Sequence, residues 1–107
     1  MEAAGDITPD YQNAAHHIVP STDGRYAKAI QCRDILTKYG VDINSANNGV
    51  FLPTVENVSK ATYHGALHNA KYYDKVHSLL SQAKSYDEVV DVLSIIKTSL
   101  LKGTFMS

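Results

Sequence analysis

The segment Ala14-Ala15-His16-His17-Ile18-Val19-Pro20 places two adjacent histidines in a short stretch that contains β-branched residues and ends at a proline. This pattern predicts a brief strand that ends in a turn. Successive side chains of a strand point to opposite faces, so His16 and His17 are expected to point in opposite directions. The two histidines are therefore predicted to have different surroundings and different roles.

A second short strand is predicted downstream, where Val50-Phe51-Leu52-Pro53 follows Gly49. The preceding segment, 41–49 with the sequence VDINSANNG, is dense in Asp, Asn, Ser and Gly. Such residues hydrogen-bond their own backbone or tolerate positive φ, so this segment is predicted to be a structured loop. Asp42 is expected to cap the loop.

Two helices are predicted around these strands. Apolar residues recur at helical spacing from 25 to 39, which indicates a helix inserted between the two strands. A further helix is expected to begin between 55 and 63 and to continue to about Ala83. His64 and His68 lie four residues apart in it, so their rings would share one face of a helix.

The last helix is predicted at 85–102. Ser85 and Glu88 have the spacing of a capping box, and Gly103 follows the final apolar residues. This helix is the most apolar part of the chain and is expected to supply the core. Its apolar residues are Val89, Val90, Val92, Leu93, Ile95, Ile96, Leu100 and Leu101.

Length and composition limit the class of protein. A chain of 107 residues predicts one domain (1–107), with 1–13 as an irregular lead-in and an α+β, mostly helical fold. The 44% apolar content argues against a wholly disordered chain. The net charge of −1 gives no bulk basic signal for nucleic acid, so binding of a polyanion would need a local patch or a metal. With Cys32 as the single cysteine, a disulfide framework and a zinc ribbon are excluded, and neither a signal region nor a membrane span is expected.

Four of the five histidines fall in two short clusters. Three imidazoles that meet in space can hold a transition metal with one coordination position open, and a fourth can act as a base. His64 and His68 would supply two ligands, and His16 or His17 the third, with the other of that pair taking a proton from water. The pattern predicts a metal-assisted hydrolase. Imidazole ligands favour Zn²⁺, with Ni²⁺, Mg²⁺ and Mn²⁺ as further candidates.

The motifs also resemble a known family. Ala15-His16-His17, the segment 48–53 (NGVFLP) and the segment 63–68 (YHGALH) followed by Tyr72-Tyr73 are similar to the AHH family of polymorphic bacterial toxin domains. This family lies within the HNH and endonuclease VII superfamily of ββα-metal nucleases. The resemblance covers residues 14–77 and implies a ββα-metal core. The chain departs from the related colicin DNases in the helix inserted at 25–39 and in its slightly acidic charge.

The resemblance implies a role for each matching residue. The implied metal ligands are His16, His64 and His68. His17 would be the general base. Asn48 would tie back the loop so that the base is held in orientation, with Asn47 as its rival, because an amide both donates and accepts without adding charge.

The resemblance further implies a metal-dependent endonuclease, with DNA favoured over RNA. The domain would be the C-terminal effector of a secreted or injected toxin that acts in the cytoplasm of a target cell and is neutralised by an immunity protein. Two alternatives stay open. A non-enzymatic binding module would need a closed zinc site with Cys32 or His17 as fourth ligand, and a hydrolase of a small substrate would need an enclosed pocket.

Residues after the histidine pair are candidates for contact with nucleic acid. Lys71, Tyr72 and Lys75 could meet phosphates or stack on a base, and the alternative is a solvated face with tyrosines at the edge of the core. His77 is expected to be structural or exposed. The two arginines, Arg25 and Arg33, are expected to have structural or surface roles.

Overall fold

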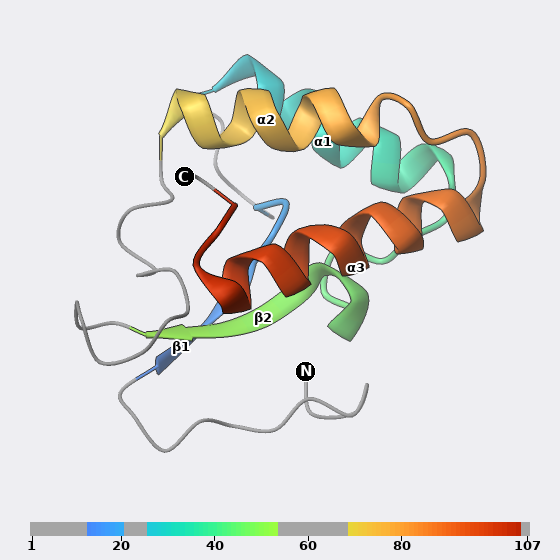
Figure 1. Cartoon of the computed structure of the whole chain (residues 1–107). Helices are drawn as coiled ribbons and strands as arrows, with labels where there is room; N and C mark the ends of the chain where they lie inside the picture. The colour runs from blue at the N-terminus through green and yellow to red at the C-terminus, as the bar shows by residue number, and fades with distance from the viewer. Residues whose placement is uncertain (1–12, 21–25, 54–68, 106–107) are drawn as a thin grey trace.

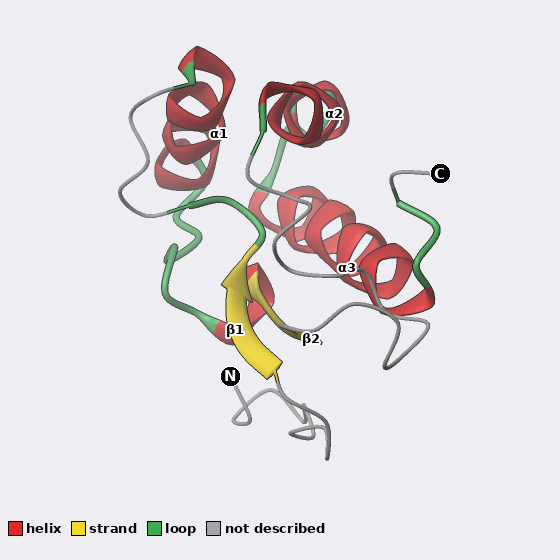
Figure 2. Ribbon diagram, turned by 90° about the vertical axis from the view of Figure 1, so that its left-hand side faces the viewer, coloured by secondary structure: helices red, strands yellow, loops and turns green. Residues whose placement is uncertain are grey.

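The computed structural model describes residues 13–20, 26–53 and 69–105. These residues form an antiparallel strand pair and three α-helices, a mostly helical α+β fold as predicted (Figures 1 and 2). The elements in chain order are β1 (Asn13–His17), α1 (Ala27–Lys38), the short 3-10 helix η2 (Ala46–Asn48), β2 (Gly49–Pro53), α2 (Ala70–Leu80) and α3 (Tyr86–Lys102).

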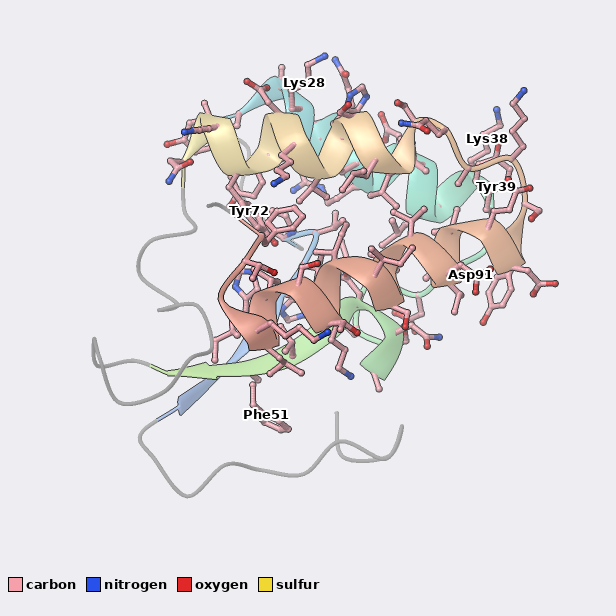
Figure 3. All side chains as sticks on the ribbon, viewed as in Figure 1. Lys28, Lys38, Tyr39, Phe51, Tyr72 and Asp91 are labelled. Carbon is pink, nitrogen blue, oxygen red and sulfur yellow. The ribbon has the colours of Figure 1, made fainter. Side chains whose placement is uncertain are left out.

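The pairing of β1 with β2 gives the two histidines different faces. His16 lies opposite Val50, and His17 lies opposite Gly49. Cross-strand partners point to the same side of a sheet, so His16 shares the inner face with Val50, which is 1% exposed. His17 is on the other face, the same one as Phe51, whose side chain points away from the helices in Figure 3. The predicted divergence of the two histidines is confirmed.

The helices enclose the core through stripes of buried residues. α1 and α2 run side by side (Figures 1 and 2), α2 also packs against α3, and α3 packs against β2 and η2. The buried residues of α3 recur every three or four positions, as one face of a helix requires. They are Val89, Leu93, Ile96 and Leu100. The prediction assigned too many apolar residues of α3 to the core, because Ile95 is 63% exposed and Leu101 42% exposed.

The ends of α3 follow the sequence signals. The Ser85 side chain accepts a hydrogen bond from the backbone N–H of Glu88 at 3.1 Å, and the two side chains meet at 3.3 Å. The helix ends at Gly103, which has a φ of 72° that favours glycine. The predicted helix start at Ser85 and the predicted helix end at Gly103 are confirmed, and the Glu88 carboxylate accepts from the Ser85 hydroxyl. α1 similarly occupies the segment predicted between 25 and 39.

The start of α2 differs from the prediction. Asn69 has extended backbone (φ −150°, ψ 165°), and its side chain accepts from the backbone N–H of Tyr72 at 2.9 Å. The helix therefore begins at Ala70, because an N-cap residue lies outside the helical conformation. A single helix running unbroken from before His64 to about residue 83 is wrong. His64 and His68 lie outside the described residues, so their pairing on one face stays a prediction.

Cys32 on α1 is 1% exposed, and burial raises the pKa of its thiol to about 12, against a lowering by the charge of Lys28. We expect the native thiol to react with iodoacetamide only as fast as the protein opens, because the thiolate is the nucleophile. The unfolded thiol ionises above pH 9 while the folded one keeps its proton, so this group lowers the free energy of unfolding as pH rises from 9 to 12. Alkylation with iodoacetamide followed by mass spectrometry, with and without urea, tests the expected slow reaction of the native thiol. Equal alkylation rates with and without urea would contradict it.

Candidate functional site

His16 is buried at the inner face of the strand pair, with 2% of its surface exposed. Its Nε2 lies 3.1 Å from the hydroxyl of Tyr72, and that hydroxyl donates to the carbonyl oxygen of Ile18 at 2.9 Å. A hydroxyl carries one proton and a carbonyl oxygen only accepts, so Nε2–H of His16 must donate to Tyr72. Figure 3 shows Tyr72 pointing from α2 into the interior. The contact joins β1 to the first turn of α2.

His17 is half-buried on the outer face of the strand pair, opposite a glycine that adds no side chain. Its Nε2 donates to the side-chain oxygen Oδ1 of Asn44 at 3.1 Å, because an amide oxygen only accepts. The lone pair of the neutral ring therefore lies on Nδ1. Asn44 is itself held by Asp42, whose carboxylate accepts from the Asn44 backbone N–H at 2.8 Å. This bond is the capping contact predicted for Asp42.

Sequence reasoning missed Asn44. The loop 41–49 holds three asparagines, and nothing in their order shows which one reaches a histidine 27 residues earlier in the chain. The only available signal was the density of Asp and Asn in that loop. Asn44 orients His17 and leaves its Nδ1 as the nitrogen that can take a proton.

Asn48 is fully buried and uses its whole amide group. Oδ1 accepts from the backbone N–H of Val19 at 2.9 Å, while Nδ2 donates to the carbonyl oxygens of Val19 and Ile43, both at 2.8 Å. These bonds tie the chain just after His17 to the loop that carries Asn44. Whether these bonds hold the base in orientation, the role expected of Asn48, stays a prediction. Its rival Asn47 is half-buried and lines a surface pocket between η2 and α3.

The three residues expected to contact nucleic acid have different surroundings. Lys71 is exposed in the first turn of α2. Tyr72 is 0% exposed, and its hydroxyl is bonded to His16 and Ile18. The expectation that Tyr72 stacks on a base is therefore corrected: its ring is packed inside the fold. Lys75 donates to the carbonyl oxygen of Phe105 and lies 4.6 Å from the centroid of that ring, so its charge is directed to the segment after α3.

Arg33 and His77 were expected to have structural or surface roles, and their positions in the fold agree with this expectation. Arg33 donates from Nη1 to the carbonyl oxygen of Pro20 at 3.1 Å and is half-buried. His77 lies half-buried in the last turn of α2, where a positive charge would be favourable to the helix dipole. Arg25 lies outside the described residues.

The fit to a metal ion depends on both histidine clusters. Residues 13–20, 26–53 and 69–105 contain no group of three His, Cys, Asp or Glu side chains that could hold a metal. His16 and His17 diverge, so the described part of the site offers at most one of them to a shared ion. The other two expected ligands, His64 and His68, lie outside the residues that the structure describes. The three-histidine site therefore stays a prediction.

The alternative binding module would need Cys32 or His17 as the fourth ligand of a closed zinc site. Cys32 is buried on α1, with 1% of its surface exposed. No described His, Asp or Glu side chains join it in a metal-binding group. The geometry therefore gives no support to Cys32 as a fourth ligand.

Comparison with known protein families identifies a matching family model. A family described as a nuclease family of the HNH/ENDO VII superfamily with conserved AHH has a sequence model that matches residues 1–99. The three letters of that motif stand here as Ala15-His16-His17. No curated protein and no solved structure matches the chain. Among the helices of the described segments, none has the length and apolar character needed to span a bilayer.

Proposed function

The chain belongs to the AHH family of nucleases in the HNH/ENDO VII superfamily, and from this premise we propose that it is a metal-dependent endonuclease with His17 as its general base. Family membership makes nucleic acid the substrate. The observation that carries the residue assignment is the separation of the histidine pair: His16 is buried against Tyr72, while His17 is held by Asn44 on the outer face.

The described residues suit His17 to take a proton from water. Its Nε2–H is held by Asn44, so the attacking water would lose its proton to Nδ1. The water oxygen forms the new bond to phosphorus, and the bond from phosphorus to the leaving oxygen breaks. The ring becomes an imidazolium whose Nε2–H keeps its bond to the neutral amide. Asn48 contributes by fixing the loop, with no charge added next to the base.

We further propose His16, His64 and His68 as the residues that would hold the metal, with Zn²⁺ favoured by the imidazole ligands. The ion would supply stabilisation of the negative charge on the phosphate and the leaving oxygen. Lys71, exposed in the first turn of α2, is proposed to contact a backbone phosphate. DNA is proposed over RNA on the resemblance to the colicin DNases.

The biological setting is a proposal that rests on the resemblance to polymorphic toxins. In it, the domain is the C-terminal effector of a larger secreted or injected protein. It acts in the cytoplasm of the target cell, and a cognate immunity protein neutralises it in the producer.

A cleavage assay tests the proposed function. We expect the purified chain to nick or linearise supercoiled plasmid with a divalent ion (Mg²⁺, Mn²⁺, Ni²⁺ or Zn²⁺ in separate reactions). A chelator should stop the reaction, and added ion should restore it, because the ion stabilises charge in the transition state. Cleavage of RNA alone would correct the substrate. If neither nucleic acid is cut with any of these ions, the enzyme assignment fails and the binding module is favoured.

A further inference from the structure

We propose that Tyr72 is a positioning residue of this site: its hydroxyl fixes the ring orientation and the tautomer of His16. The inference rests on the proposed function in one respect, the role of His16 as a metal ligand. The claim that Tyr72 sets the orientation and tautomer of His16 rests only on the contacts between β1 and α2. Tyr72 thus acts through His16 and touches neither substrate nor ion itself.

The hydroxyl of Tyr72 links two points of the same short segment. It accepts from Nε2–H of His16 at 3.1 Å and donates to the carbonyl oxygen of Ile18 at 2.9 Å. The ring is therefore held relative to the backbone just beyond it, which limits rotation of the imidazole. All of these groups are buried, where a hydrogen bond is electrostatically stronger and an unmade one is costly. The rings also meet edge to face, with centroids 5.7 Å apart.

Tyr72 itself is fixed from several sides. Its backbone N–H is bonded to the side chain of Asn69, which caps α2. Its ring meets those of Tyr73 and Phe105 edge to face, at centroid distances of 5.2 Å and 5.7 Å. The hydroxyl is therefore placed by packing before anything binds at His16.

The consequence concerns which nitrogen of His16 can bind a cation. Histidines that ligate metals donate the proton of their other ring nitrogen to a fixed acceptor, which sets the tautomer. Here the proton is on Nε2, so the lone pair of the neutral ring is on Nδ1. The Tyr72 contact therefore selects Nδ1 as the donor atom of His16 and preorganises the ring for it.

The first test compares two tyrosine variants. Tyr72→Phe removes the hydroxyl, and Tyr73→Phe removes one hydroxyl from the next residue, which is also buried (2% exposed). Calorimetric titration with Zn²⁺ alone should show affinity about 10-fold to 100-fold weaker for Tyr72→Phe, the usual effect of losing such a partner. Tyr73→Phe should bind Zn²⁺ as the parent does. Equal affinities of all three proteins, or equal losses in both variants, would overturn the proposal.

The second test needs no variant of Tyr72 and covers the case in which Tyr72→Phe fails to fold. Nitrogen-15 NMR of the metal-free parent, with the His16 signals assigned from His16→Gln, should show Nε2 protonated and its proton protected from exchange. Protonation at Nδ1 alone overturns the inference. If the parent binds no Zn²⁺, the metal part of the proposed function fails, while the tautomer still decides the role of Tyr72.

Discussion

Replacement of His17 by alanine is expected to slow nucleic-acid cleavage by about 10²-fold to 10⁴-fold, the usual contribution of a positioned general base. The fold should survive, because His17 is half-buried and its hydrogen bond is to the exposed Asn44. The lost stability should stay within about 1 kcal/mol, typical of one hydrogen bond near the surface. Zn²⁺ affinity should also be kept, since the proposed ligand His16 lies on the opposite face.

The measurement is the single-turnover rate of plasmid cleavage, with circular dichroism and Zn²⁺ titration on the same samples. His77→Ala is the matched control, because it removes a half-buried histidine that lies on α2 with no assigned chemistry. The control should cut at the rate of the parent. A His17→Ala protein that folds, binds Zn²⁺ and still cuts as fast as the parent would remove His17 from the role of base.

Replacement of Asn48 by alanine is expected to have the largest effect on stability, a loss of about 3 to 5 kcal/mol in the free energy of unfolding. Three backbone groups would lose their partner: the N–H and carbonyl of Val19 and the carbonyl of Ile43. Each buried polar group left unpaired costs about 1 to 3 kcal/mol, partly relieved where water enters. That loss is a large share of the stability of a domain of this size.

Urea denaturation of Asn48→Ala, Asn48→Asp and Asn47→Ala tests the brace. The aspartate keeps an oxygen that accepts from the backbone N–H of Val19, but it places a carboxylate oxygen against the carbonyl oxygens of Val19 and Ile43. Asn48→Asp should therefore lower the free energy of unfolding at least as much as Asn48→Ala at neutral pH. Asn47→Ala, at a half-buried position, should change stability by about 0.5 kcal/mol or less. A loss in Asn47→Ala as large as in Asn48→Ala would contradict the assignment of Asn48.

Much of the fold was predictable because its signals are local. Helical spacing and a capping box mark α1 and α3 within their own residues, and the alternation of side chains along a strand separates His16 from His17. The same kind of signal identified 41–49 as a structured loop and Asp42 as its cap. For the candidate residue Asn48, the family resemblance supplied the prediction that its side chain ties the loop back.

Other features could not be predicted because competing local signals were nearly equal. The histidine spacing favoured a long helix across residue 69, whereas the side chain of Asn69 satisfies a backbone N–H of the first turn, so the helix begins at Ala70. A tyrosine near basic residues suits both base stacking and core packing. Its neighbours decide between these outcomes, and for Tyr72 they include Phe105, 33 residues further along the chain.

The sequence by itself determined the elements of this protein and the opposite directions of its histidine pair, since propensity, capping and side-chain periodicity act over a few residues. Only the tertiary structure decided what each histidine meets. Asn44 reaches His17 and Tyr72 reaches His16 because packing brings together residues 27 and 56 positions apart. Hydrogen bonds over such separations form only after the core has placed their donors and acceptors, and these bonds set the ring nitrogen that each histidine presents.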